Sequence, residues 1–151
     1  MFPDVVGMEN LTANWTRDVI DTAREYSDRR TKLLSFEVKL TVNSSNVREV
    51  YFQAVSNSSW ANLGYLVAAE VQGSATMREL QVLAGSHGIG VMRLDAENPT
   101  ESQILIPSKE SADVDWDSAN RLAEENDDFV DYIRLVRQFY QTGDPRENDW
   151  D

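Results

Sequence analysis

The segment SFEVKL, residues 35–40, places a glutamate and a lysine two positions apart between apolar neighbours. In a β-strand, residues two apart point to the same side, so Glu37 and Lys39 share one face while Phe36 and Leu40 share the other. The carboxylate of such a pair can bind a divalent cation, and the ammonium group can act on a water molecule or a phosphate bound beside it. Taken alone, the pair is more typical of a strand face that meets solvent.

Two further features give this pair possible partners. Asp4 follows a proline at the start of an apolar segment, and two neighbouring strands can each offer one carboxylate to Mg²⁺. Gln53, Asn57 and Trp60 stand at positions i, i+4 and i+7 of the next helical segment, off its apolar stripe. The sequence therefore predicts a polar row on a helix that could face a ligand near the strand pair.

The apolar periodicity predicts an α/β fold in which strands alternate with crossover helices. Strands are expected over residues 2–7, 33–42, 64–71 and 89–95, with a shorter one in SQILIP, and helices over 14–26, 46–62, 76–88 and 117–141. Capping-box spacing of Asn46 with Glu49, and of Thr76 with Glu79, marks two helix starts. The clearest parallel pair is 64–71 with 89–95, because one helix joins them.

The final helix is expected to turn an apolar stripe inward, formed by Leu122, Phe129, Val130, Ile133, Val136 and Tyr140. The 151 residues suit one domain over 1–141, followed by a polar, frayed tail over 142–151. The abrupt start with a strand suggests that upstream elements are missing. No apolar stretch approaches the roughly 20 residues of a membrane span.

Composition excludes several kinds of site. There is no cysteine, which rules out disulfides, thiolate metal sites and cysteine catalysis and is compatible with the cytoplasm. The net charge is −12, of which residues 101–151 carry −9, and this balance argues against non-specific nucleic-acid binding by the whole chain. The basic cluster of Arg29, Arg30 and Lys32 is either a solvated loop or a phosphate contact.

The order of Asp4, then Glu37-Val38-Lys39 in a strand, then Gln53 on a helix resembles the PD-(D/E)xK, or restriction-endonuclease-like, nuclease superfamily. Within it, the strings YFQAVSNSSWANLGYLVAAE, LAGSHGIGVMRLD and LAEENDDFVDYI resemble the HrgA-type restriction-associated proteins. The resemblance implies a mixed central sheet flanked by helices. It also implies elements before Asp4, and an upstream helix-turn-helix-like domain, that this sequence does not contain.

The resemblance further implies a Mg²⁺- or Mn²⁺-dependent DNA endonuclease of restriction or phage-defence type. Asp4, Glu37 and the backbone carbonyl near Val38 would bind the metal. Lys39 would orient or deprotonate the attacking water, or stabilise the transition state, and Gln53 would position the water or the backbone.

DNA is the implied partner, and a homodimer follows by analogy with nucleases that cut two strands. The candidate nucleic-acid contacts are Arg29, Arg30, Lys32 and Asn57. Two other hypotheses remain open: a catalytically silent, nuclease-like interaction module, and an acidic DNA mimic that uses residues 101–151 as its surface.

Overall fold

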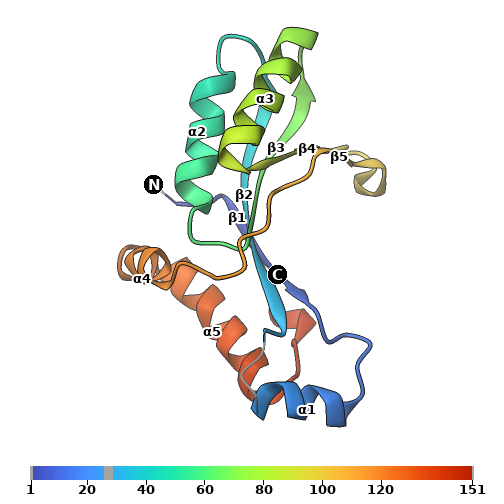
Figure 1. Cartoon of the computed structure of the whole chain (residues 1–151), viewed down its shortest axis with the longest axis vertical. Helices are drawn as coiled ribbons and strands as arrows, with labels where there is room; N and C mark the ends of the chain where they lie inside the picture. The colour runs from blue at the N-terminus through green and yellow to red at the C-terminus, as the bar shows by residue number, and fades with distance from the viewer. Residues whose placement is uncertain (1, 26–28, 151) are drawn as a thin grey trace.

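A computed structural model of the chain describes residues 2–25 and 29–150 and contains a five-stranded mixed sheet with the strands in chain order (Figure 1). The strands are β1 (Val5–Asn10), β2 (Thr31–Val42), β3 (Leu63–Val71), β4 (Gly90–Arg93) and β5 (Gln103–Ile106). β2, β3 and β4 run parallel, whereas β1 and β5 are antiparallel to their neighbours. The predicted α/β class and the predicted parallel pair are confirmed.

Helices α2 (Val47–Ser58) and α3 (Ser74–His87) lie side by side on one face of the sheet (Figure 1). Each is the crossover between two parallel strands, as the alternation of strands and helices predicts. Their apolar sides meet the sheet in a first core that includes Tyr51, Leu66, Leu80 and Val91, all fully buried. This core fixes α2 above the middle of β2.

A second core joins the lower part of the sheet to helices α4 (Trp116–Glu125) and α5 (Asp127–Thr142). Trp60, at the end of α2, lies edge-on to Phe129 with ring centroids 5.0 Å apart. Tyr132, which the predicted stripe did not include, is also buried here and donates its hydroxyl to the Gly7 carbonyl at 2.7 Å. The second core therefore ties α5 to both β1 and the end of α2.

Helix α1 (Arg17–Glu25) lies in the connection between β1 and β2 and contributes no buried residue. Its apolar spacing did predict a helix, but Trp15 is 43% exposed and Val19 is 51% exposed. Tyr26, expected on the same stripe, lies outside the described residues.

None of the described helices is long and apolar enough to cross a membrane.

The predicted start of α2 is confirmed, because Asn46 is its N-cap residue, but neither predicted capping box forms. The Asn46 side chain makes no cap bond to α2; its amide instead donates to the Thr41 carbonyl at 3.0 Å and accepts from the Asn43 amide at 2.8 Å. α3 begins at Ser74, after Gly73, so Thr76 lies inside the helix rather than before it. The spacing of residue types alone could not show that the Asn46 side chain forms other hydrogen bonds or that α3 begins before Thr76.

The predicted single helix over 117–141 is also wrong, because the chain breaks it at Asn126. This residue is extended, with φ −143° and ψ 111°, and its side chain accepts hydrogen bonds from the amides of Asp128 at 2.9 Å and Phe129 at 3.3 Å. Asn126 is therefore the N-cap of α5, a role that asparagine fills well.

The tail after α5 also differs from the prediction, because it folds back over the sheet edge instead of fraying. A short 3-10 turn, η2 (Glu147–Asp149), leads to Trp150, whose indole donates to the Pro145 carbonyl at 2.7 Å. The Trp150 ring lies edge-on to Tyr132, with centroids 5.8 Å apart. The second core thus continues to the end of the described chain.

A further short turn, η1 (Pro99–Glu101), precedes β5.

Replacing Asn126 by alanine tests the break between α4 and α5. Asn126→Ala removes both cap bonds and should lower the free energy of unfolding by about 1 kcal/mol, measured by urea denaturation. Asn120→Ala, which removes only an exposed bond to Glu124 within α4, is the matched control and should have a smaller effect. Equal stability of Asn126→Ala and the wild type would mean that the two helices are continuous in solution.

Candidate functional site

The polar face of β2 points into the protein and its apolar face points outward. Ser35 is fully buried and Glu37 is only 4% exposed, whereas Val38 is 40% and Leu40 is 81% exposed. Helix α2 covers the polar face, where Ser58 donates to the Ser35 hydroxyl at 3.0 Å. The interpretation of Glu37 as part of a solvated strand face is therefore wrong.

Glu37 is held by one partner on each carboxylate oxygen. Its Oε2 accepts a hydrogen bond from Asn57 Nδ2 at 2.9 Å, and its Oε1 lies 3.4 Å from Lys39 Nζ. The Lys39 side chain is 31% exposed, so the ion pair connects a buried carboxylate with the surface. A buried carboxylate requires such partners, since an unpaired charge in the interior is strongly unfavourable.

Asp4 lies beside the same part of β2. Its amide donates to the Phe36 carbonyl at 3.2 Å, and its Oδ2 accepts from the Val38 amide at 2.9 Å. The pairing of β1 ends with Val5 opposite Phe36, and Asp4 forms a bend just before that pair. The Asp4 carboxylate therefore lies against the backbone of Val38, the residue between Glu37 and Lys39.

The backbone of Val38 adds a further group to this site. In an extended strand the N–H and C=O of one residue point to the same side, and the Val38 N–H points to Asp4. The Val38 carbonyl therefore points to the same edge of β2. Beyond Phe36 the described part of β1 no longer covers this edge. The structure thus places two of the predicted metal-binding residues, Asp4 and Val38, in contact, and pairs Glu37 with Lys39 on either side of Val38 in the chain.

Helix α2 carries two amide oxygens without a donor, one of them on Asn57, the residue that contacts Glu37. Gln53 Oε1 and Asn57 Oδ1 are both buried and have no hydrogen-bond partner among the described residues. These residues stand one helical turn apart, as the sequence spacing predicts, and Asn57 contacts Glu37 directly. Because a buried acceptor without a donor costs about 1–3 kcal/mol, the pair favours a bound donor or cation at this place.

The oxygen atoms of Asp4, Glu37 and the Val38 carbonyl are of the kind that a hard divalent cation binds. Carboxylate and carbonyl oxygens are the ligands that Mg²⁺ prefers, and two carboxylates with waters complete such a site. Within residues 2–25 and 29–150 no three histidine, aspartate or glutamate side chains gather in a cluster that could hold a metal ion. A metal at this place would therefore depend on the two carboxylates of Asp4 and Glu37, with the Val38 carbonyl as a third ligand.

Two of the candidate nucleic-acid contacts lie in the interior. Arg30 is 2% exposed, donates to the Tyr140 carbonyl at 2.7 Å and stacks over the Tyr140 ring at 4.5 Å, and burial lowers the pKa of its guanidinium. Asn57 is 3% exposed and bonded to Glu37. We therefore withdraw the predicted contacts of Arg30 and Asn57 with nucleic acid.

The other two candidate contacts are paired with an acid. Glu110 lies 2.7 Å from Lys32 Nζ and 3.3 Å from Arg29 Nη2. The hydrogen bond from Lys32, followed by that from Arg29, holds the pKa of the Glu110 carboxyl below its usual value. Much of the positive charge of this cluster is therefore already offset within the protein.

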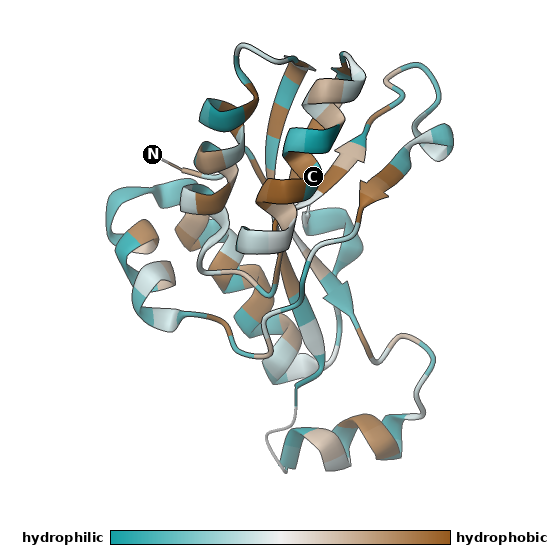
Figure 2. Ribbon diagram, turned by 45° about the horizontal axis from the view of Figure 1, so that its top comes forward, coloured by the Kyte–Doolittle hydropathy of each residue, from teal (hydrophilic) through white to brown (hydrophobic). Residues whose placement is uncertain are grey.

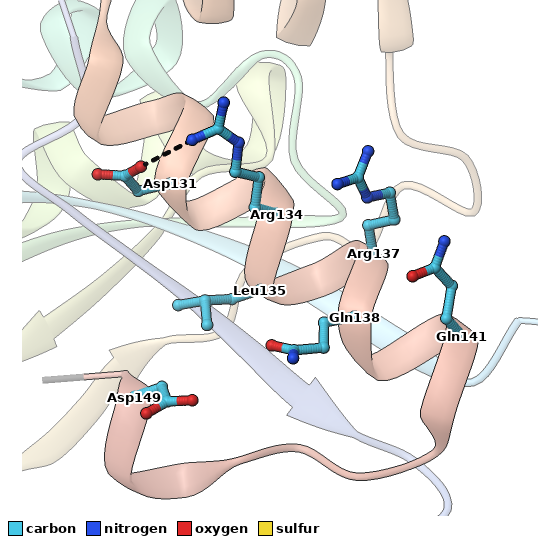
Figure 3. A pocket seen from close by; sticks show the side chains of 7 residues that line it. All are labelled: Asp131, Arg134, Leu135, Arg137, Gln138, Gln141 and Asp149. Atoms are coloured by element: carbon cyan, nitrogen blue, oxygen red, sulfur yellow. Dashed lines mark ion pairs between the residues drawn. The ribbon is translucent and has the colours of Figure 1, made fainter.

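A groove between α5 and the C-terminal segment, which the sequence did not predict, has two arginines and two aspartates in its lining (Figure 3). It has a volume of about 530 Å³ and is lined by Asp131, Arg134, Leu135, Arg137, Gln138, Gln141 and Asp149. Arg134 pairs with Asp131 at 3.6 Å, so its charge is partly offset. No lining residue belongs to β2 or α2, and we do not assign the groove to the site.

Comparison with protein-family models, with curated proteins and with solved structures gives no match for this chain. The resemblance to the PD-(D/E)xK nucleases stays a prediction. The candidate site therefore rests on its geometry.

Replacing Asn57 tests whether its amide stabilises the buried Glu37 carboxylate. Asn57→Ala should lower the free energy of unfolding by about 1.5–3 kcal/mol, the contribution typical of a hydrogen bond to a charged group, as measured by urea denaturation. Ser56→Ala, at the neighbouring exposed position of α2, should change stability by less than about 0.5 kcal/mol. A similarly small change for Asn57→Ala would show that Glu37 does not depend on this bond.

Proposed function

We propose that this protein is a divalent-metal-dependent nuclease that hydrolyses phosphodiester bonds of DNA. The observation that carries the proposal is the position of Asp4: its carboxylate binds the Val38 amide, beside a buried Glu37 that is paired with Lys39. Two carboxylates and a lysine at one open strand edge are the groups that such hydrolysis requires. The resemblance described above is the basis for the restriction or phage-defence setting.

Mg²⁺ or Mn²⁺ bound by Asp4, Glu37 and the Val38 carbonyl would acidify a water molecule and offset negative charge on the scissile phosphate. Lys39 is the cation at the mouth of this site, since its side chain is partly exposed while Glu37 is buried. Its ammonium group can orient the attacking water or donate a hydrogen bond to a phosphate oxygen as negative charge develops there.

The residues of α2 have a supporting role in this proposal. The Asn57 amide fixes the Oε2 side of Glu37 and thereby sets the direction in which the other oxygen points. Gln53 has a buried acceptor oxygen without a donor, which suits a water molecule held near the carboxylates. Gln53 therefore positions the water, and a substitution there should cost less activity than one at Glu37.

A cleavage assay at low ionic strength tests the proposal, because the net charge of −12 predicts weak, salt-sensitive DNA binding. Plasmid DNA should be nicked or cut with Mg²⁺ or Mn²⁺ and left intact with a chelator. Asp4→Asn, Glu37→Gln and Lys39→Met should each reduce the rate by about 100-fold or more.

Lys109→Met is the matched control, since Lys109 is an exposed lysine that belongs to neither β2 nor α2. It should keep most of the activity. Circular dichroism of every variant separates loss of chemistry from loss of fold. Cleavage that persists at the wild-type rate in folded Glu37→Gln would contradict the proposal.

A further inference from the structure

Within residues 2–25 and 29–150, one face of the sheet is left without a helix. Leu66 and Val91 face α2 and α3, and Leu33 faces α5, so these helices all pack on the face that also carries Glu37. Helix α1 buries no residue. The opposite face, which we call the open face, is formed by Val5, Phe36, Val38, Leu40, Tyr65, Val67, Met92 and Ile104.

The strand register shows that this open face is continuous. Val38 pairs with Val67, Val67 with Met92, and Met92 with Ile104, which gives one apolar row across four strands. A second row runs from Val5 through Phe36 to Tyr65, where the last two rings stack with centroids 6.0 Å apart. Figure 2 shows hydrophobic segments along the strands, with α2 and α3 together on one side of the sheet.

Much of this surface is exposed. Leu40 is 81% exposed, Ile104 57%, Val5 51% and Val38 40%, whereas Tyr65 and Val67 on the central strand β3 are only 9% and 7% exposed. Single exposed apolar residues are ordinary, but a contiguous apolar surface of this kind marks an interaction site. None of the eight residues is charged, in a protein whose net charge is −12.

We propose that a second copy of this chain covers the open face, so that two sheets pack face to face in a homodimer. An uncharged face can meet its own copy without placing like charges opposite each other, as a two-fold interface requires. Charged surfaces of two copies with a net charge of −12 repel each other, so the uncharged face is where they can meet at the lowest electrostatic cost.

The size of the face is sufficient for such an interface. Five strands about 4.8 Å apart, each contributing about six residues of roughly 3.3 Å, span about 500 Å². Two copies would then bury about 1,000 Å² in total, which is at the lower limit for a specific interface. We therefore expect a reversible dimer, with its sheets about 10 Å apart.

The candidate site would stay accessible in this dimer. Glu37 and Lys39 belong to the opposite face of β2, so each site would lie on the outer side of the pair. Dimer formation is therefore independent of the proposed nuclease activity. Either proposal can fail without the other.

Sedimentation equilibrium over about 5–500 µM protein, at moderate salt and without added metal, tests the dimer. The wild type should pass from monomer to dimer with concentration. Leu40→Glu and Ile104→Glu should each weaken association at least tenfold, because each would bury an unpaired charge. Both side chains are exposed in the monomer, so the monomer fold should tolerate the change.

Val82→Glu is the matched control. Val82 is 61% exposed, but it lies on α3 and not on the open face. It should leave the association constant unchanged. A wild type that stays monomeric over the whole range would overturn the proposal, as would equal effects of Val82→Glu and Leu40→Glu in variants whose circular dichroism shows the native fold.

Discussion

The burial of the Glu37 carboxylate beneath α2 is the constraint on which most of this structure depends. An ionised group in the interior is tolerated only with partners, and Asn57 and Lys39 supply one for each oxygen. Because side chains alternate along a strand, a one-residue slip of β2 would move Glu37 to the other face. The Glu37 contacts therefore set both the register of β2 and its position under α2.

The same constraint links the candidate site with the open face. Once Ser35, Glu37 and Lys39 point inward, Phe36, Val38 and Leu40 must point outward, where no described helix covers them. The two surfaces are thus the two sides of one strand. The polar, partly buried site on one side of β2 is thus accompanied by exposed apolar residues on the other side.

Apolar alternation predicted β2, β3, β4 and their parallel pairing, but it placed the first strand over 2–7 instead of Val5–Asn10 and did not show which side of β2 is inside. The general preference of charged residues for water favours a solvated Glu37, and only the contact with Asn57 on another element overrides it. Likewise, the helical period continues through Asn126, so it could not show the break that the asparagine cap makes. Arg30 looked like a surface cation because its aromatic partner, Tyr140, is 110 residues away.

Of the competing hypotheses, the acidic DNA mimic has the least support, since Arg134 and Arg137 interrupt the acidic residues on the outer side of α5. The central claim is that Asp4 and Glu37 bind one metal ion, and anomalous diffraction from crystals soaked in Mn²⁺ tests it most directly. A peak about 2.0–2.6 Å from carboxylate oxygens of both residues is the expected result. No peak between them, in a crystal where Glu37 still binds Asn57 and Lys39, would contradict it.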